Sequence, residues 1–178
     1  TLRKHAPDIP IHAICLDEVR NAGLYWRPTS RRKNEQTGAE QLWDEISEAP
    51  MATEFAISRF LTPVLAKAAS RTGWALFLDS DILARDDVDD LFAECNPDKA
   101  VMCVQHNHVV PEGIKMDGQL QTLYRRKNWS SVAAYNLAHP SNRKLTVQLI
   151  NTVPGRDLHA FSWLEDDEIG ALDASWNY

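Results

Sequence analysis

The chain has 178 residues, 44% hydrophobic and 25% charged, proportions typical of a globular protein rather than a disordered one. Its 19 basic and 25 acidic residues give a net charge of -6, which argues against a general nucleic-acid surface. This length suits one domain, and no internal repeat divides it. We therefore predict a single domain over residues 1–178 with no nucleic-acid partner.

Cysteine usage and hydropathy bear on the cellular compartment. Cys15, Cys95 and Cys103 lack metal-type spacing, and two of them, Cys15 and Cys103, lie in apolar runs, so we predict these two as reduced, buried thiols. Reduced thiols favour a cytoplasmic protein, either free or associated with a membrane surface. No apolar stretch approaches the roughly 20 residues that span a bilayer, so we predict no transmembrane segment.

The first part of the chain is predicted to alternate between helix and strand. Residues 2–6 end at a proline, which is a helix stop signal, and residues 9–16 form an apolar run typical of a strand. A polar loop is predicted over about 28–41, where basic and turn-forming residues cluster. Residues 53–70 show helical periodicity that Pro63 interrupts, so we expect the helix to kink or restart there.

The remaining elements continue the alternation. They are a strand over 74–78, a helix start over 86–92, a strand over 100–104, a long loop over about 105–126, a strand over 132–135, a helix over 140–152 and a short helix over 165–168. A loop of that length in a compact domain is usually functional or disordered. Alternating strands and helices predict an α/β layer fold with a mostly parallel sheet, which binds ligands beyond the carboxyl ends of its strands.

Asp79 and Asp81 are the most informative pair of residues. They follow the apolar strand over 74–78, and carboxylates at i and i+2 on extended backbone point to the same side. Mg²⁺ and Mn²⁺ prefer oxygen ligands, and Mg²⁺ typically bridges one or two carboxylates to substrate phosphates. Asp87 and Asp89 have the same spacing, but they open a predicted helix, where carboxylates favour the helix dipole.

Four ordered segments resemble the core of GT-A glycosyltransferases, close to glycosyltransferase family 8. They are residues 53–60 (TEFAISRF), 74–83 (WALFLDSDIL), 127–136 (KNWSSVAAYN) and 164–169 (LEDDEI). The ending Trp176-Asn177-Tyr178 also fits the family. The resemblance covers most of the chain from about residue 40 onward.

The resemblance implies a Rossmann-like three-layer α/β sandwich that transfers a hexosyl group, with retention, from a nucleotide-diphosphate sugar to a hydroxyl acceptor. It implies a UDP-sugar donor, a saccharide or other acceptor, and a Mn²⁺ or Mg²⁺ ion. It also implies a first strand before Thr1 and a segment after Tyr178 with a histidine that completes the metal site. We therefore expect residues 1–178 by themselves to be weakly active or inactive.

The resemblance assigns roles to individual residues. Asp79 and Asp81 would hold the metal, and Asp166 and Asp167 would stabilise positive charge on the sugar. Arg59, as a basic group before the acidic strand, would bind the diphosphate. The other donor contacts would be Thr53, Ser80, Ser130 and Ser131. The polar side chains expected above the site, as acceptor or sugar contacts, are His106, His108, Lys115, Asp117 and Gln119.

Two other functions stay open on the sequence alone. The first is a phosphatase of the haloacid dehalogenase type, in which Asp79 is the nucleophile and Asp166-Asp167 the later acidic motif. Leu83 argues against it, because that family usually has Thr or Val at this position. The second is an inactive or truncated domain that binds a nucleotide sugar without turning it over.

Overall fold

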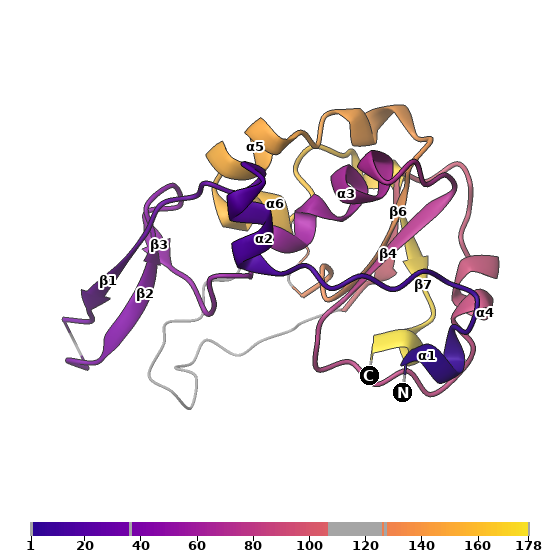
Figure 1. Cartoon of the computed structure of the whole chain (residues 1–178), viewed down its shortest axis with the longest axis horizontal. Coiled ribbons are helices and arrows are strands. Elements are labelled where there is room, and N and C mark those ends of the chain that lie inside the picture. Colours follow the sequence, from indigo (N-terminus) through magenta and orange to yellow (C-terminus); the bar gives the residue numbers. More distant parts are fainter. Residues whose placement is uncertain (1, 36, 107–125, 127, 178) are drawn as a thin grey trace.

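The computed structural model describes residues 2–35, 37–106, 126 and 128–177, and they form an α/β structure with two β-sheets (Figure 1). The smaller sheet has the strand order β1-β2-β3, and the larger one has the order β4-β6-β5-β7. The α/β class predicted from the sequence is therefore confirmed. The larger sheet carries the candidate functional residues.

The larger sheet is mixed. Its strands are β4 (Trp74–Leu78), β5 (Val101–Val104), β6 (Val132–Asn136) and β7 (Ile169–Leu172). β6 runs antiparallel to both β4 and β5, whereas β5 and β7 run parallel. The described strands thus do not show a mostly parallel sheet. Because β5 and β6 run in opposite directions, β6 begins at the sheet edge where β5 ends.

This strand arrangement collects chain ends at one edge of the sheet. Since β4 and β5 both lie antiparallel to β6, the strands β4, β5 and β7 all end at the same edge, where β6 begins. The residues after β4, before β6 and after β7 therefore share this edge, which we call the carboxyl edge. β4 is the outermost strand on its side, and all five of its apolar residues are only half-buried.

Hydrophobic side chains pack against both faces of the larger sheet. On β5, Val101 and Cys103 join one cluster, whereas Met102 and Val104 join the other, as the two-residue period of a strand requires. The first cluster includes side chains of α2 (Leu16–Asn21), α3 (Thr62–Ala68), α5 (Val147–Thr152) and α6 (Gly155–His159). The second includes side chains of α4 (Val88–Ala93). Helical side chains therefore pack against both faces of the larger sheet.

Several predicted elements are confirmed. The strands over 74–78, 100–104 and 132–135 correspond to β4, β5 and β6. Pro63 lies in the first turn of α3, where its missing N–H costs nothing, so the helix restarts there after the 3-10 turn η1 (Ser58–Leu61). The other short elements are α1 (Leu2–His5), η2 (Pro140–Arg143), η3 (Asp166–Glu168) and η4 (Ala174–Asn177).

The predicted strand over 9–16 is wrong. These residues form no strand, and Leu16 instead begins α2. Asp17 and Glu18 lie in the first turn of α2, where carboxylates interact favourably with the helix dipole. Cys15 precedes α2 and is exposed, so the prediction that it is buried is also wrong.

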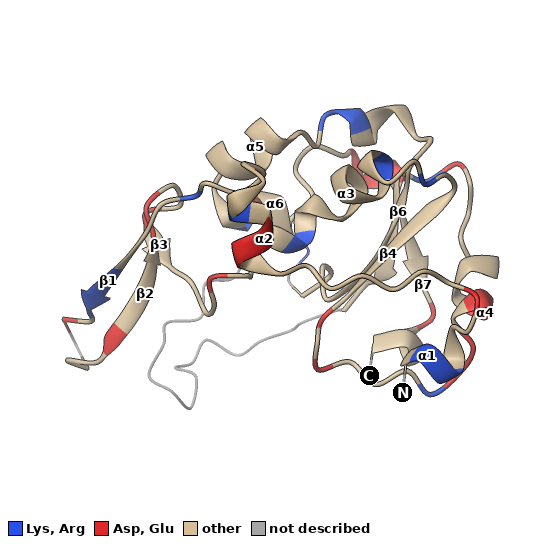
Figure 2. Cartoon of the chain, in the orientation of Figure 1, with Lys and Arg blue, Asp and Glu red and all other residues tan. Residues whose placement is uncertain are grey.

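The predicted polar loop over 28–41 is largely a β-hairpin. It contains β1 (Thr29–Lys33) and pairs it with β2 (Glu40–Asp44), and β3 (Ala49–Pro50) adds to the other side of β2. In Figure 2 the basic residues of β1 lie beside an acidic end of β2. The Arg32 guanidinium lies 4.4 Å from the centre of the Trp43 ring. This hairpin is stabilised by charge and cation–π contacts rather than by the apolar alternation that marks most strands.

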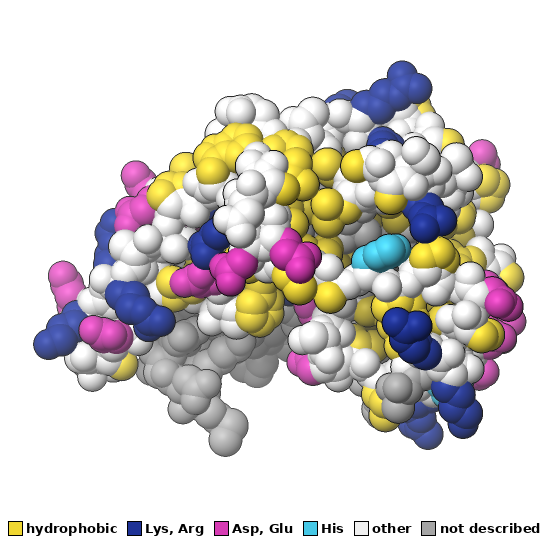
Figure 3. Space-filling model, viewed as in Figure 1, with side chains coloured by type: hydrophobic (Ala, Val, Ile, Leu, Met, Phe, Trp, Pro, Cys, Tyr) yellow, Lys and Arg dark blue, Asp and Glu magenta, His cyan; other side chains and the backbone are white. Residues whose placement is uncertain are grey.

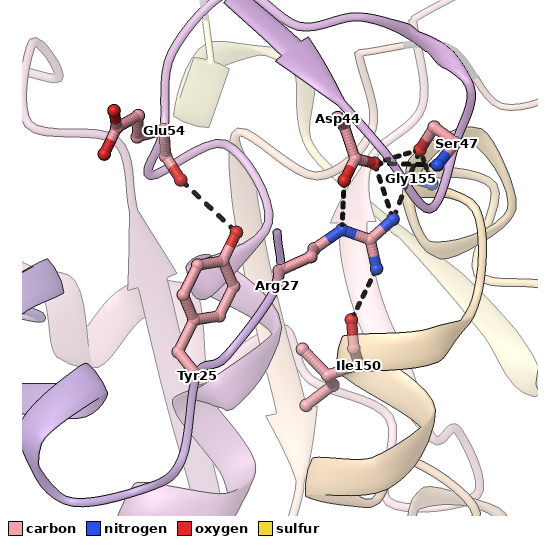
Figure 4. A network of polar contacts seen from close by, with 7 residues as sticks. All are labelled: Tyr25, Arg27, Asp44, Ser47, Glu54, Ile150 and Gly155. Atoms are coloured by element: carbon pink, nitrogen blue, oxygen red, sulfur yellow. Dashed lines mark hydrogen bonds and ion pairs between the residues drawn. The ribbon is translucent and has the colours of Figure 1, made fainter. Parts of the chain in front are cut away.

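A buried ion pair attaches the smaller sheet to the helices (Figure 4). Arg27 Nε and Nη2 donate to the two carboxylate oxygens of Asp44, at 3.0 and 2.7 Å, and Nη1 donates to the Ile150 carbonyl at 2.8 Å. Ser47 donates to Asp44 through its backbone N–H and its hydroxyl. The Ser47 Oγ accepts from the Gly155 N–H at 2.8 Å. Arg27 therefore links β2 to α5, and Ser47 links the same group to α6.

Surface charge is mixed, as the composition predicts. Basic and acidic side chains are interspersed on the face drawn in Figure 3. Among the described residues, no helix combines the length and the apolar character that crossing a membrane requires.

Candidate functional site

Asp79 lies at the carboxyl edge, directly after β4. Its N–H donates to the Ser131 carbonyl at 3.1 Å, which extends the pairing of β4 with β6 by one step. The Asp79 carbonyl then accepts from the Ile82 N–H at 3.1 Å, so Ser80 and Asp81 form a turn. The backbone is thus no longer extended at Asp81, and the geometric reason for expecting both carboxylates on one side of a strand does not apply. Ser80 and Asp81 are exposed on this turn.

Arg59 holds the carboxylate of Asp79 with two bonds. Its Nη2 lies 2.9 Å from Asp79 Oδ1, and its Nη1 donates to Oδ2 at 3.1 Å. The same Nη1 donates to the Ser130 carbonyl at 3.1 Å, and Nε donates to the Ala56 carbonyl at 2.9 Å. The guanidinium also lies 5.0 Å from the centre of the Phe77 ring. In this structure Arg59 is thus engaged with Asp79 and the backbone, and only part of its donor capacity is left for a phosphate.

Ser130 lies beside this pair and contacts a histidine from α6. Its hydroxyl shares a 2.7 Å hydrogen bond with His159 Nδ1. The His159 ring packs edge-on against Phe60, with 5.2 Å between the ring centroids. Ser130 is almost fully buried, whereas His159 keeps part of its surface exposed.

The surroundings of His159 keep its imidazole neutral. Desolvation, together with the positive charges of Arg59 and Arg27, lowers its pKa from 6.5 to about 3. A neutral imidazole can share a hydrogen bond with a hydroxyl without bringing a third cation near Arg59.

His106 follows β5 at the same carboxyl edge. Its carbonyl accepts from the Trp129 indole N–H at 3.3 Å, and its Nε2 lies 2.9 Å from the side-chain nitrogen of Asn177. The ending of the chain therefore returns to the edge that carries Asp79. The other predicted sugar or acceptor contacts, His108, Lys115, Asp117 and Gln119, lie outside the described residues, as does most of the predicted loop over 105–126.

Asp166 and Asp167 lie in η3, which leads into β7. The first residue of β7, Ile169, pairs with Val101 at the edge opposite to the carboxyl edge. Arg126 Nη2 forms an ion pair with Asp166, and Lys99 Nζ donates to the Asp167 carbonyl at 2.6 Å. η3 thus lies at the edge opposite to Asp79, and the catalytic role of these two carboxylates stays a prediction. The short helix predicted over 165–168 is present as η3, where Glu165 and Glu168 form a capping box.

Of the predicted donor contacts, three come together. Arg59, Ser130 and Ser131 contact Asp79 or one another directly. Thr53 lies at the turn before η1, where its carbonyl accepts from the Ala56 N–H at 3.1 Å. No contact brings the Thr53 side chain to Asp79 among the interactions described.

The carboxylate oxygens of Asp79 and Asp81 are ligands that suit a hard divalent cation, provided that oxygens of a substrate bind the same ion. A carboxylate has about four lone-pair sites, so Asp79 keeps acceptor capacity beside Arg59. Asp81 lies two residues away on an exposed turn. Within the described ranges, no three His, Cys, Asp or Glu side chains gather as a metal site. Oxygens of a bound diphosphate would complete the coordination, as Mg²⁺ sites often require.

Sequence reasoning missed His159 and Arg126. His159 lies in a helix of five residues, 80 positions from Asp79 in the numbering, and no motif marks it. The Arg126 side chain is buried and donates to the Ala160 carbonyl at 2.7 Å and to the Phe161 carbonyl at 3.1 Å. Only the fold brings His159 to Ser130 and Arg126 to Asp166.

Comparisons with known proteins give one curated relative. No protein-family model matches the sequence, and no solved structure matches it. The chain is 40% identical, over all of its 178 residues, to Protein CDI of Arabidopsis thaliana. The match covers 60% of that protein, so the chain spans about three fifths of the length of this curated relative.

Proposed function

We propose that the protein is a metal-dependent glycosyltransferase that moves a hexosyl group from a nucleotide-diphosphate sugar to a hydroxyl acceptor. The observation that carries this proposal is the position of Asp79 and Asp81. They follow β4 at the carboxyl edge, where Ser131 contacts Asp79 and Ser130 contacts Arg59. In α/β sheets this edge is where ligands bind. The four segments that resemble GT-A glycosyltransferases support the same assignment.

In the proposed reaction, the residues of the carboxyl edge bind and orient the diphosphate of the donor. A Mn²⁺ or Mg²⁺ ion held with Asp79 and Asp81 would supply Lewis-acid neutralisation of the diphosphate leaving group. Arg59 adds positive charge at the same place and keeps the Asp79 carboxylate directed. Ser80, exposed on the turn between the two aspartates, is available to hydrogen-bond a phosphate or a sugar hydroxyl.

The second Asp-x-Asp pair of the chain provides a matched control for this proposal. Asp87 caps α4, where its carboxylate accepts from the Asp89 N–H at 3.0 Å, and Asp89 is exposed in the first turn. In the full-length protein, Asp81→Asn is expected to weaken Mn²⁺-dependent binding of UDP about tenfold or more and to lower UDP-sugar hydrolysis. Asp89→Asn, with the same change in charge, is expected to leave both unchanged.

These binding and hydrolysis measurements, with two further assays, separate the alternative functions. If no nucleotide sugar binds, or if Asp81→Asn leaves binding and turnover intact, the proposal is wrong. An acid-labile phosphate on Asp79 after exposure to a phosphomonoester would indicate a phosphatase. Binding of a nucleotide sugar without hydrolysis or transfer to any acceptor would indicate a binding domain.

A further inference from the structure

His159, Ser130, Arg59 and Asp79 form a continuous line of contacts. The line begins in α6 with the 2.7 Å hydrogen bond between His159 Nδ1 and Ser130 Oγ. It continues through the Ser130 carbonyl, which accepts from Arg59 Nη1 at 3.1 Å. It ends at the Asp79 carboxylate, which lies 2.9 Å from Nη2 and 3.1 Å from Nη1 of Arg59.

We propose that His159 is a positioning residue for Asp79 and acts on it through Ser130 and Arg59. The contact line exists whether or not the protein is a glycosyltransferase, but its consequence for metal and donor binding rests on the proposed function. His159 does not touch the donor in this proposal. Its role is to hold the Ser130 peptide, which in turn helps to fix the plane of the Arg59 guanidinium.

The guanidinium of Arg59 has few orientations left. Its Nε donates to the Ala56 carbonyl, and its Cζ lies over the Phe77 ring, 5.0 Å from the ring centre. Nη1 divides its bonding between Ser130 and Asp79. A guanidinium is planar and its donors have a fixed fork geometry, so a shift of the Ser130 carbonyl changes the direction in which the fork meets Asp79.

The His159 ring is itself held in place. Phe60 contacts it edge-on at 5.2 Å, and Phe60 also packs edge-on against Trp163 at 6.0 Å. This aromatic group belongs to the cluster that covers one face of the larger sheet. The position of the imidazole is thus set by the core, and the Ser130 hydroxyl transmits that position to the carboxyl edge.

Positioning can be tested without any metal. We suggest ¹⁵N NMR of the Arg59 side chain in the metal-free full-length protein, because restricted rotation of a paired guanidinium separates its Nη signals. The variants are His159→Leu, which removes the hydrogen bond, His159→Asn, whose amide can reach Ser130 Oγ, and Ser130→Ala, which removes the hydroxyl. Leu145→Val is the control, because Leu145 is equally part of the core but lies outside the contact line.

The expected result is that His159→Leu and Ser130→Ala merge or broaden the Arg59 Nη signals. His159→Asn and Leu145→Val should keep these signals separate. The double variant His159→Leu/Ser130→Ala should resemble either single one, because both remove the same bond. If the signals stay separate in both Ser130→Ala and folded His159→Leu, the positioning role is wrong. Should His159→Leu fail to fold, Ser130→Ala alone decides the matter.

A second measurement links the contact line to ligand binding. Mn²⁺ titration followed by electron paramagnetic resonance should show about 10- to 100-fold weaker binding in His159→Leu and Ser130→Ala. His159→Asn should restore it, whereas a purely structural loss would follow the melting temperature and would affect Leu145→Val as well. Absence of Mn²⁺ and UDP binding in the unmodified protein would contradict the proposed function. The Arg59 signals would still decide whether His159 positions Asp79.

Discussion

Arg59 and Asp79 share two short contacts across 20 positions of the sequence, Nη2 to Oδ1 at 2.9 Å and Nη1 to Oδ2 at 3.1 Å. The Arg59 side chain is 11% exposed and that of Asp79 is 25% exposed. Solvent is therefore largely excluded from the Arg59 guanidinium, whereas a quarter of the Asp79 side chain stays accessible. This geometry directs a carboxylate toward the carboxyl edge of the sheet.

Replacement of Arg59 by lysine is expected to destabilise the protein in spite of the retained charge. An ammonium cannot form the paired contacts with Asp79 while it also bonds the Ala56 carbonyl. We expect a loss of about 1–3 kcal/mol in the free energy of unfolding, measured by urea denaturation. Arg20→Lys at the more exposed pair with Glu54 should change it by less than about 1 kcal/mol. Equal losses in the two variants would contradict this account.

Acid is expected to destabilise the protein through His159. Its native pKa is about 3, lowered by desolvation and by Arg59 and Arg27, against 6.5 in the unfolded chain. Between these pH values the unfolded state binds a proton that the native state does not. The free energy of unfolding therefore falls as the pH falls, by at most about 2 kcal/mol between pH 6.5 and 5.

The pH effect can be isolated with His159→Asn, which does not titrate. Urea denaturation of both proteins at several pH values between 5 and 7 should give curves that diverge as the pH falls. The unmodified protein should lose more stability than the variant. Parallel curves would mean that the imidazole is protonated equally in the folded and unfolded states.

Asp44 is expected to be among the residues least tolerant of substitution. Asp44→Ala would leave the Arg27 guanidinium buried without its carboxylate, which costs about 3–5 kcal/mol. The smaller sheet should then detach from α5 and α6, which protease sensitivity near β1 and β2 would reveal. Glu45→Ala, at the exposed pair with Arg32, is the control and should cost less than about 1 kcal/mol. Similar losses for the two variants would contradict the distinction between buried and exposed pairs.

Removal of the Tyr135 hydroxyl is expected to leave stability unchanged or to increase it. Tyr135 is fully buried on β6, burial raises the pKa of its phenol, and its hydroxyl has no hydrogen-bond partner among the described residues. Tyr135→Phe removes an unsatisfied group, which is worth up to about 1–3 kcal/mol. For a domain of this size the melting temperature should rise by about 2–4 °C for each kcal/mol. A clear decrease would show that the hydroxyl has a partner in solution.

The sequence predicted the larger sheet better than the smaller one, for physical reasons. The strands over 74–78, 100–104 and 132–135 are runs of consecutive apolar residues that pack in the core. Such runs can be recognised from neighbouring residues in the sequence alone. The residues over 28–41 form strands because Arg32 contacts Trp43 and because Arg27 is buried with Asp44, and both are contacts between residues distant in sequence. A scan for hydrophobic periodicity cannot detect such contacts.

The candidate site shows the same division. Asp79 and Asp81 are recognisable because they follow a strand, but their relation to Arg59 depends on where η1 packs. His159 carries no pattern at all, since its significance comes from the 2.7 Å contact with Ser130. The direction of β6 could not be predicted either, because an apolar strand has the same residue pattern in a parallel and in an antiparallel pairing.

The outer position of β4 has a practical consequence for handling these 178 residues. On the side away from β6, no other described strand pairs with it, and its apolar residues from Trp74 to Leu78 are half-buried. An apolar strand with free backbone groups is a template for strand addition by another chain. Preparations of these residues alone should therefore be checked for concentration-dependent self-association before any loss of ligand binding is attributed to Asp79 or Asp81.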